Sequence, residues 1–273
     1  MTYEMIALDM DGTVLNDEKQ IDGATREAIR MALAAGKEVV FCTGRSYSEM
    51  NEFLPDFRGM HYLCGESGAL VYDLKERTPL KLTTLSGASI LQIKEAIRGR
   101  DVMVQIFREG QSYLGRKYFP LMDLYGMGQY QESFRHNARL VEDIFEVLEP
   151  NGDGAEKINL YHRNVEERLV TLAKLEAVSV QSTMVFSEET SLECSPSGIS
   201  KAAGLAEICK VKGISMEQVI MVGDNENDRE ALCAAGLAAA MGNAVPAIKE
   251  ICDVVLADNN HGGCKEAIEK YLL

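Results

Sequence analysis

Two aspartates near the N-terminus have the spacing of a catalytic carboxylate pair. Asp9 and Asp11 lie in the run DMDGT, directly after an apolar run at 5–8. If that run is a buried strand, both carboxylates reach the crevice where open α/β sheets bind ligands. One carboxylate can attack phosphorus as a nucleophile, and the other can donate a proton to the leaving oxygen and later accept one from water. Alone, the motif is also compatible with a turn.

Two further motifs offer groups that bind a phosphoryl oxygen. Thr43 and Gly44 follow the next apolar run, and a hydroxyl, a glycine amide and a helix N-terminus together form an anion cradle. Lys201 falls in the first turn of a predicted helix, where the helix dipole disfavours a cation, so an anion is expected beside it. The alternatives are a plain helix cap at Thr43, a solvent-exposed Lys201, and an Arg45 that pairs with a surface carboxylate.

A second acidic cluster follows a later apolar run. Asp224, Asn227 and Asp228 lie in the run GDNEND, after apolar residues at 219–222. Carboxylates gathered at one point repel each other unless a hard cation intervenes, and Mg²⁺ prefers such oxygen ligands. Asp228 could instead cap the next helix. All four motifs come at the carboxyl ends of separate predicted strands, and together they provide the groups that phosphoryl transfer needs.

The elements that position these motifs predict a doubly wound parallel α/β sheet. The apolar runs are continuous rather than alternating, as expected for parallel strands covered on both faces. Strands alternate with helical patterns at both ends of the chain. The strands are expected at 5–8, 39–42, 62–64, 69–72, 219–222, 237–241 and 254–257, and helices at 21–35 and 229–235.

The middle of the chain predicts an inserted α+β domain. Its helices and strands follow one another in a different order from those of the ends. We expect a core domain formed by 1–84 and 187–273, with the insert at 85–186. Within the insert, helices are expected at 88–97, 140–148 and 165–175, a turn at 150–154, and a strand at 178–186.

Composition limits the possible partners and the compartment. The formal net charge is −14 in 273 residues, which disfavours binding to nucleic acid or to a membrane surface. A phosphate ester would also be repelled at long range, so its site needs local cations. No apolar run reaches the length of a membrane span. Seven cysteines without a C-x-x-C pair indicate reduced thiols and predict a cytoplasmic protein, whereas the oligomeric state is not determined.

The ordered set of motifs resembles the haloacid dehalogenase (HAD) superfamily over nearly the whole chain. The insert follows the second motif, which resembles the subgroup with a C2B cap, the Cof-type phosphatases of subfamily IIB. Gly68-Ala69 and the run AMGNA at 240–244 agree with that subgroup. The sequence departs from that subgroup at two positions: Ser67 stands where asparagine is usual, and Ala202 stands where many relatives have glycine. The carbon-halide hydrolases of the superfamily lack the acid/base aspartate two residues after the nucleophile. This chain has Asp11 at that position, which implies phosphate chemistry.

The resemblance implies a role for each motif. Asp9 would be the nucleophile that forms an aspartyl-phosphate, and Asp11 the general acid and base. Mg²⁺ would be held by the carboxylates of Asp9 and Asp224 and by the main-chain carbonyl of Asp11. Thr43 and Lys201 would bind the phosphoryl oxygens, and Gly44 would donate an amide to them. Asn227 and Asp228 would orient Lys201 and metal-bound water. The insert would close over the site, and its side chains would select the leaving group.

The implied activity is Mg²⁺-dependent hydrolysis of small phosphorylated metabolites such as sugar phosphates. A phosphomutase or phosphotransferase has the same core and differs in the acceptor of the phosphoryl group. A regulator that binds phosphate esters without turnover is a second alternative, disfavoured because nucleophile, acid/base and metal carboxylates are all present. A receiver-type signalling domain is disfavoured by the large insert.

Overall fold

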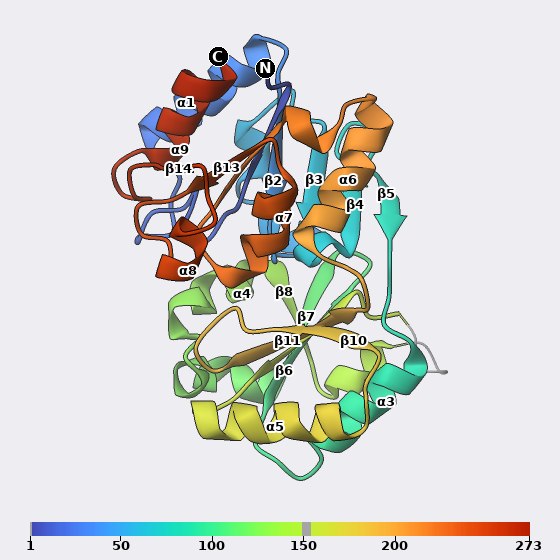
Figure 1. The fold of residues 1–273 in the computed structure, drawn as a ribbon. Helices are drawn as coiled ribbons and strands as arrows, with labels where there is room; N and C mark the ends of the chain where they lie inside the picture. The colour runs from blue at the N-terminus through green and yellow to red at the C-terminus, as the bar shows by residue number, and fades with distance from the viewer. Residues whose placement is uncertain (1, 149–153) are drawn as a thin grey trace. The chain divides into compact units, whose positions relative to one another are not determined.

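The apolar runs at both ends of the chain form one sheet in the computed structural model, which describes residues 2–148 and 154–273 (Figure 1). The chain divides into two compact units. Unit 1 contains Met1–Arg45, Glu52–Lys81 and Ser200–Leu273, and unit 2 contains Ser46–Asn51 and Leu82–Ile199. No helix among the described residues is long and apolar enough to cross a membrane.

The sheet of unit 1 has the strand order β14-β13-β12-β1-β2-β3-β4-β5. Neighbours from β14 to β3 pair in parallel, and β4 is antiparallel to β3. The doubly wound α/β class is therefore confirmed. The strands are β1 (Met5–Leu8), β2 (Glu38–Cys42), β3 (Tyr62–Gly65), β4 (Leu70–Asp73), β5 (Thr78–Leu82), β12 (Val219–Gly223), β13 (Leu237–Ala240) and β14 (Val254–Val255).

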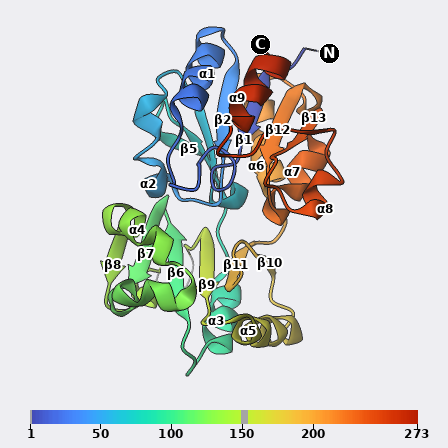
Figure 2. The ribbon, with the colours of Figure 1, turned by 90° about the vertical axis from the view of Figure 1, so that its left-hand side faces the viewer.

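Helices cover both faces of this sheet (Figures 1 and 2). The helix α1 (Gly23–Ala34) packs with α9 (Gly263–Ala267), whereas α6 (Lys201–Lys212) packs with α7 (Arg229–Ala234). A short helix, α8 (Pro246–Lys249), connects β13 to β14. The side chains of β1, β2 and β12 are buried because helices lie over both faces, which is the physical reason for their continuous apolar sequences.

The central strands bring three motifs to the same edge of the sheet. In the parallel register, Leu8 pairs with Phe41 on one side and with Val222 on the other. The residues that follow β1, β2 and β12 therefore lie side by side at the carboxyl ends of three adjacent strands. The fourth motif contains Lys201, the first residue of α6, and the side chain of Lys201 reaches Asp9 at the end of β1.

The loop after β3 supports the loop after β2. Its three residues Glu66, Ser67 and Gly68 all have positive φ, at 55°, 59° and 97°. In this conformation the Ser67 amide donates to the carbonyl of Thr43 at 2.9 Å, and the Glu66 amide donates to the carbonyl of Arg45 at 2.9 Å. Ser67, the departure from the usual asparagine, thus supports the Thr43 loop through its main chain.

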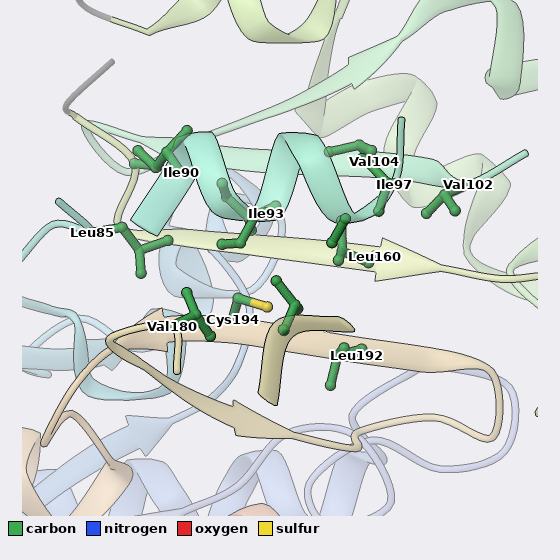
Figure 3. Packing of buried hydrophobic residues seen from close by; sticks show 14 of the residues in the cluster. Leu85, Ile90, Ile93, Ile97, Val102, Val104, Leu160, Val180, Leu192 and Cys194 are labelled. Atoms are coloured by element: carbon green, nitrogen blue, oxygen red, sulfur yellow. The ribbon is translucent and has the colours of Figure 1, made fainter. Parts of the chain in front are cut away.

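The sheet of unit 2 has the order β10-β11-β9-β6-β7-β8. Two helices, α3 (Gly87–Ala96) and α5 (Val165–Ala177), cover one face and bury an apolar cluster, part of which Figure 3 shows. A further short helix, α4 (Gln131–Asn137), lies in the segment between β7 and β8. The strands are β6 (Met103–Arg108), β7 (Gln111–Gly115), β8 (Ala138–Val141), β9 (Lys157–Tyr161), β10 (Ser182–Val185) and β11 (Ser191–Pro196).

The expected helix at 140–148 is wrong. Residues 138–141 form β8, which pairs in parallel with β7, and a 3-10 turn follows at Ile144–Val147. The side chain of Leu140 packs on one apolar cluster, whereas those of Ile144 and Leu148 pack on another. One face of a single helix could not place Leu140 on one cluster and Ile144 and Leu148 on the other. The predicted turn at 150–154 lies, up to residue 153, outside the described residues.

Unit 2 includes residues that the sequence placed elsewhere. Its sheet takes in β11, which pairs with β9 and β10, so the unit extends to Ile199 rather than to 186. It also includes α2 (Tyr47–Met50), because the amide of Ser48 donates to the carbonyl of Gly110 and the amide of Ser112 donates to the Ser48 hydroxyl. Both segments are joined to unit 2 by contacts between distant parts of the sequence.

Candidate active site

Lys201 connects two of the predicted acidic motifs. Its Nζ lies 2.6 Å from Oδ1 of Asp9 and 2.5 Å from Oδ1 of Asp228, and the three side chains are buried. Burial alone would lower the pKa of Lys201, but Asp228 and Asp9 outweigh that effect and raise it. The lysine is therefore a permanent cation. The two carboxylates also explain how a lysine is accommodated in the first turn of α6.

Asp228 is fixed on its other side by the loop that precedes it. Its Oδ2 accepts hydrogen bonds from the amides of Asp224 at 3.1 Å and Asn225 at 3.2 Å. The side chain of Asp228 therefore does not cap α7, because one oxygen closes the preceding 3-10 turn at Glu226–Asp228 and the other binds Lys201. A Cβ at Gly223 would lie 2.5 Å from the Asp228 carboxylate, so this approach requires glycine.

Three carboxylates converge at the point where a cation is expected. One oxygen each of Asp9, Asp224 and Asp228 lies within 4.8 Å of the others. Burial, followed by the charge of Asp228, raises the pKa of Asp9 well above its ordinary value. The same two causes raise the pKa of Asp224 to about 6. Three carboxylates face one ammonium group, so the residues fit a hard divalent cation that would complete the charge balance.

The backbone of the DMDGT run is shaped to approach this cluster. Gly12 has φ +75°, and a Cβ there would lie 2.5 Å from Oδ2 of Asp224. The hydroxyl of Thr13 donates to Oδ1 of Asp224 at 3.1 Å, and the amide of Asn243 donates to the carbonyl of Gly12 at 2.7 Å. The sequence predicted no role at the site for Thr13, although it belongs to the same run, or for Asn243.

The carboxylate of Asp11 binds a basic pair, Arg45 and Lys19. Its oxygens accept hydrogen bonds from Nε of Arg45 at 2.7 Å, from the Arg45 terminal nitrogen at 2.9 Å, and from Nζ of Lys19 at 3.2 Å. Burial alone would raise the pKa of Asp11, but Arg45 and then Lys19 outweigh it and lower the pKa to about 2. The partner of Arg45 is thus the second aspartate of the motif. No signal in the sequence connected Lys19 with it.

The remaining residues predicted for the site, Thr43, Gly44 and Asn227, differ in their hydrogen bonds. Thr43 is buried, and its hydroxyl accepts from the amide of Arg45 at 3.1 Å, with Gly44 between them. Asn227 precedes Asp228, but its amide oxygen is buried without a hydrogen-bond partner among the described residues. The structure thus brings Asp9, Asp224, Asp228 and Lys201 into one cluster, whereas no such contact joins Asn227 to Lys201 in the described part of the chain.

The chain is similar to known proteins over nearly its whole length. The family model of the haloacid dehalogenase-like hydrolases matches residues 6–268. The putative phosphatase YxeH of Bacillus subtilis is 26% identical over 274 residues, which cover 99% of each chain. The 5-amino-6-(5-phospho-D-ribitylamino)uracil phosphatase YcsE of the same organism is 26% identical over 270 residues, covering 99% of this chain and 96% of that one.

A solved structure shares the fold of this chain. The HAD subclass IIB sugar phosphatase BT4131 superposes with a TM-score of 0.82 and 19% identity, covering 97% of this chain and 98% of that one. This likeness gives the fold. Because the family model spans all four motifs and nearly the whole sequence, the chain belongs to the haloacid dehalogenase-like hydrolases.

Proposed function

We propose that this hydrolase is a Mg²⁺-dependent phosphatase that acts on small phosphorylated metabolites through an aspartyl-phosphate on Asp9. One observation carries the proposal above all. A buried lysine binds Asp9 and Asp228 together, at the carboxyl edge of a parallel sheet. That arrangement supplies a nucleophile next to a fixed positive charge, which phosphoryl transfer requires.

Asp9 is the group that attacks phosphorus. Its Oδ1 is engaged by Lys201, which leaves Oδ2 for the phosphoryl group. In the first step, Oδ2 forms a bond to phosphorus while the bond between phosphorus and the ester oxygen breaks. In the second step, a water oxygen forms a bond to phosphorus and the Asp9 carboxylate is released. Lys201 remains positive throughout because two carboxylates raise its pKa.

Asp11 carries the proton in both steps. Paired with Arg45 and Lys19 it is ionised at neutral pH, the form that removes a proton from attacking water. To act first as an acid it must take up a proton, and the negative charge of a bound phosphate group favours that uptake. After donating the proton to the leaving oxygen, Asp11 is again the base that the second step needs.

The metal site belongs to the carboxylate cluster. The carboxylates of Asp9 and Asp224 and the carbonyl of Asp11 would hold Mg²⁺, with Asp228 beside them. A bound Mg²⁺ stabilises negative charge on the phosphoryl oxygens. Thr43, Gly44 and Lys201 bind those oxygens, and Asn227 orients the polar groups around them. The phosphatase names of the related Bacillus subtilis proteins support a small phosphate ester as the substrate.

The test is phosphate release from a panel of phosphorylated metabolites with Mg²⁺ and with chelator. We expect Asp9→Asn to lower kcat by roughly a thousandfold or more, since it removes the nucleophile. We expect Asp11→Asn to lower kcat by about 10² to 10⁴. The matched control is Asp17→Asn, an exposed aspartate in the same segment, which should keep wild-type activity.

Two results would contradict the proposal. One is a folded wild type that releases no phosphate from any ester in the presence of Mg²⁺. The other is an Asp9→Asn variant with normal turnover. Product analysis with and without a sugar acceptor separates hydrolysis from phosphotransfer, because only a transferase yields a new phosphate ester.

A further inference from the structure

The loop at 241–245, which follows β13, contacts two of the loops that carry the carboxylate cluster. The side-chain amide of Asn243 donates to the carbonyl of Gly12 at 2.7 Å, in the DMDGT run. The main-chain amide of Val245 donates to the carbonyl of Asp224 at 3.0 Å, in the GDNEND run. All of these residues belong to unit 1. One loop outside the four motifs therefore holds the loops of two motifs.

The peptide group between Gly12 and Thr13 is held at both of its ends. Its carbonyl accepts the hydrogen bond from Asn243, and its N–H, which belongs to Thr13, donates to the carbonyl of Met10 at 3.3 Å. A peptide group is planar, so bonds to its opposite ends set the direction in which the whole group faces. Asn243 therefore helps to fix the backbone on both sides of this peptide.

The two residues joined by this peptide lie against the two oxygens of Asp224. The hydroxyl of Thr13, a buried residue, donates to Oδ1 of Asp224 at 3.1 Å. The α carbon of Gly12 packs so closely that a Cβ there would lie 2.5 Å from Oδ2. The direction of the peptide therefore decides where both contacts fall, and with them the orientation of the Asp224 carboxylate.

Asn243 is itself held in place by the loop that follows β14. Its Oδ1 accepts from the main-chain amide of Asn259 at 3.1 Å. The side-chain amide of Asn259, which is buried, donates to the carbonyl of Leu15 at 3.0 Å. The amide group of Asn243 thus has its donor side bonded to Gly12 and its acceptor side bonded to Asn259, which sets its orientation.

The glycine before Asn243 permits this arrangement. The amide of Gly242 donates to the carbonyl of Ala257 at 3.1 Å, and a Cβ at Gly242 would lie 2.8 Å from the amide nitrogen of Asp258. A side chain at this position would push the two loops apart. The run AMGNA therefore combines a glycine for the close approach of the loops with an asparagine that connects them to Gly12.

The side chain of Asn243 is exposed, unlike those of Thr13 and Asn259. Water can replace a lost hydrogen bond at an exposed site, so the bonds of Asn243 add little to the free energy of unfolding. Water does not supply the fixed direction of a side chain that is held by a second loop. The contribution of Asn243 is therefore to the orientation of Gly12 and Thr13 more than to stability.

We propose that Asn243 is a positioning residue for the metal site, which orients the carboxylate of Asp224 by holding the peptide between Gly12 and Thr13. The inference rests on the proposed function, since the cation concerned is the one that the proposed phosphatase uses. Loss of a group that orients a metal ligand typically costs about tenfold to a hundredfold in metal affinity. Asn243 acts on the ligand through two other residues, so its loss belongs near the lower end of that range.

The experiment measures metal binding by the full chain without substrate. The probe is Mn²⁺, which shares the preference of Mg²⁺ for oxygen ligands and loses its free-ion paramagnetic signal on binding. We expect Asn243→Ala to raise the Kd by about tenfold and to lower the melting temperature only slightly. Asn259→Ala keeps the main-chain amide that holds Asn243, so it should raise the Kd less. It should lower the melting temperature more, because its lost hydrogen bond is buried.

Asp22→Ala is the matched control. The side chain of Asp22 accepts from the amides of Ala24 and Thr25 at the start of α1. Its removal breaks two hydrogen bonds from a side chain to the main chain in unit 1, which is the same number as in Asn243→Ala. We expect the control to lower the melting temperature as the loss of a helix cap does, and to leave the Kd for Mn²⁺ unchanged within about twofold.

Hydrolysis of p-nitrophenyl phosphate is followed separately against the Mg²⁺ concentration. Asn243→Ala should need about tenfold more Mg²⁺ for its half-maximal rate, while its KM for the ester at saturating Mg²⁺ stays within about twofold. If wild type binds Mn²⁺ but hydrolyses no ester, the proposed function fails and the Mn²⁺ comparison decides the inference by itself. An unchanged Kd in Asn243→Ala overturns the inference, as does a rise in Kd that follows the loss of melting temperature across the three variants.

Discussion

Two buried carboxylates share one buried lysine in unit 1, and the half-buried carboxylate of Asp224 lies beside them. Lys201 binds Asp9 and Asp228 directly, while Asp224 receives its hydrogen bond from the hydroxyl of Thr13. The raised pKa values of Asp9 and Asp224 follow from burial and from mutual repulsion. These residues therefore hold more negative charge than is favourable for folding alone, which is a common property of sites built for a cation or for catalysis.

The first prediction concerns pH and Mg²⁺. The pKa of Asp224 is raised to about 6 in the folded protein, above its unfolded value, so the metal-free protein loses stability from this group as pH rises toward 6. A bound cation favours the ionised form instead. We expect Mg²⁺ at about a hundredfold over its Kd to stabilise the protein at pH 8 by about 2.7 kcal/mol, and by less below pH 6.

Thermal denaturation with Mg²⁺ and with chelator, at pH 8 and pH 5, measures this effect. Asp224→Asn is the matched variant. It should lose most of the stabilisation by Mg²⁺ at pH 8, because it removes a carboxylate that would bind the metal. An increment that is equal at the two pH values would show that the cluster does not bind the cation.

The second prediction concerns the basic pair around Asp11. Arg45 makes two hydrogen bonds to this carboxylate and Lys19 makes one, and Arg45 contributes more to the lowered pKa. We expect Arg45→Met to raise the pKa of Asp11 by roughly one to three pH units, and Lys19→Met to raise it by less. Carboxyl carbon NMR titration of the two variants measures the difference. A larger shift in Lys19→Met would show that Arg45 is not the principal partner.

At the level of elements, the close approach of α6 to the loop after β3 depends on one glycine. Gly68 has φ +97°, and a Cβ there would lie 2.2 Å from the carbonyl oxygen of Ser200, at the start of α6. The same loop donates a hydrogen bond to the main chain of Thr43. The start of α6, which carries Lys201, therefore meets the loop after β3 through a backbone contact that only glycine permits.

The third prediction tests this contact with a matched pair of glycines. Gly198 also has positive φ, at +77°, but a Cβ there would meet no atom within 4 Å. We expect Gly198→Ala to cost only the strain of a left-handed alanine, about 1–2 kcal/mol of unfolding free energy. Gly68→Ala should cost clearly more, because α6 or the loop must also shift. Urea denaturation of both variants measures the difference, and equal losses would rule out a steric role for Gly68.

The sequence predicted helices and strands correctly where a pattern of apolar residues arises from one structural environment. Continuous apolar runs marked the parallel strands because both faces of that sheet are covered. It failed at 140–148, because residues facing two different clusters mimic the periodicity of a helix. It also failed to anticipate β11 as part of the insert's sheet, since that assignment depends on pairing with β9, about 30 residues earlier in the chain.

At the level of the whole molecule, the net charge of −14 opposes the approach of an anionic substrate. At low salt the field of the whole surface acts over about 30 Å, whereas at physiological salt only charges within about 8 Å matter. The local cations of the site are the charges nearest to the phosphoryl group. Overall repulsion and local attraction therefore have different salt dependences.

The fourth prediction follows from this difference. At saturating Mg²⁺, we expect kcat/KM for a small phosphate ester to rise by about twofold or more as NaCl increases from about 10 to 150 mM, because salt screens the long-range repulsion first. Steady-state kinetics at fixed pH measures it. A steady fall over the same range would mean that local attraction controls the encounter.

The sequence by itself determined the fold class, the family and the residue types at each strand end, because these depend on local pattern and on spacing along the chain. The tertiary structure decided which of those residues form salt bridges with one another. It showed that Lys201 binds both Asp9 and Asp228, and that Asp11 pairs with Arg45 and Lys19. The bridges from Arg45 to Asp11 and from Lys201 to Asp9 span 34 and 192 residues, and they leave no local trace in a sequence because the partners meet only when the strands align.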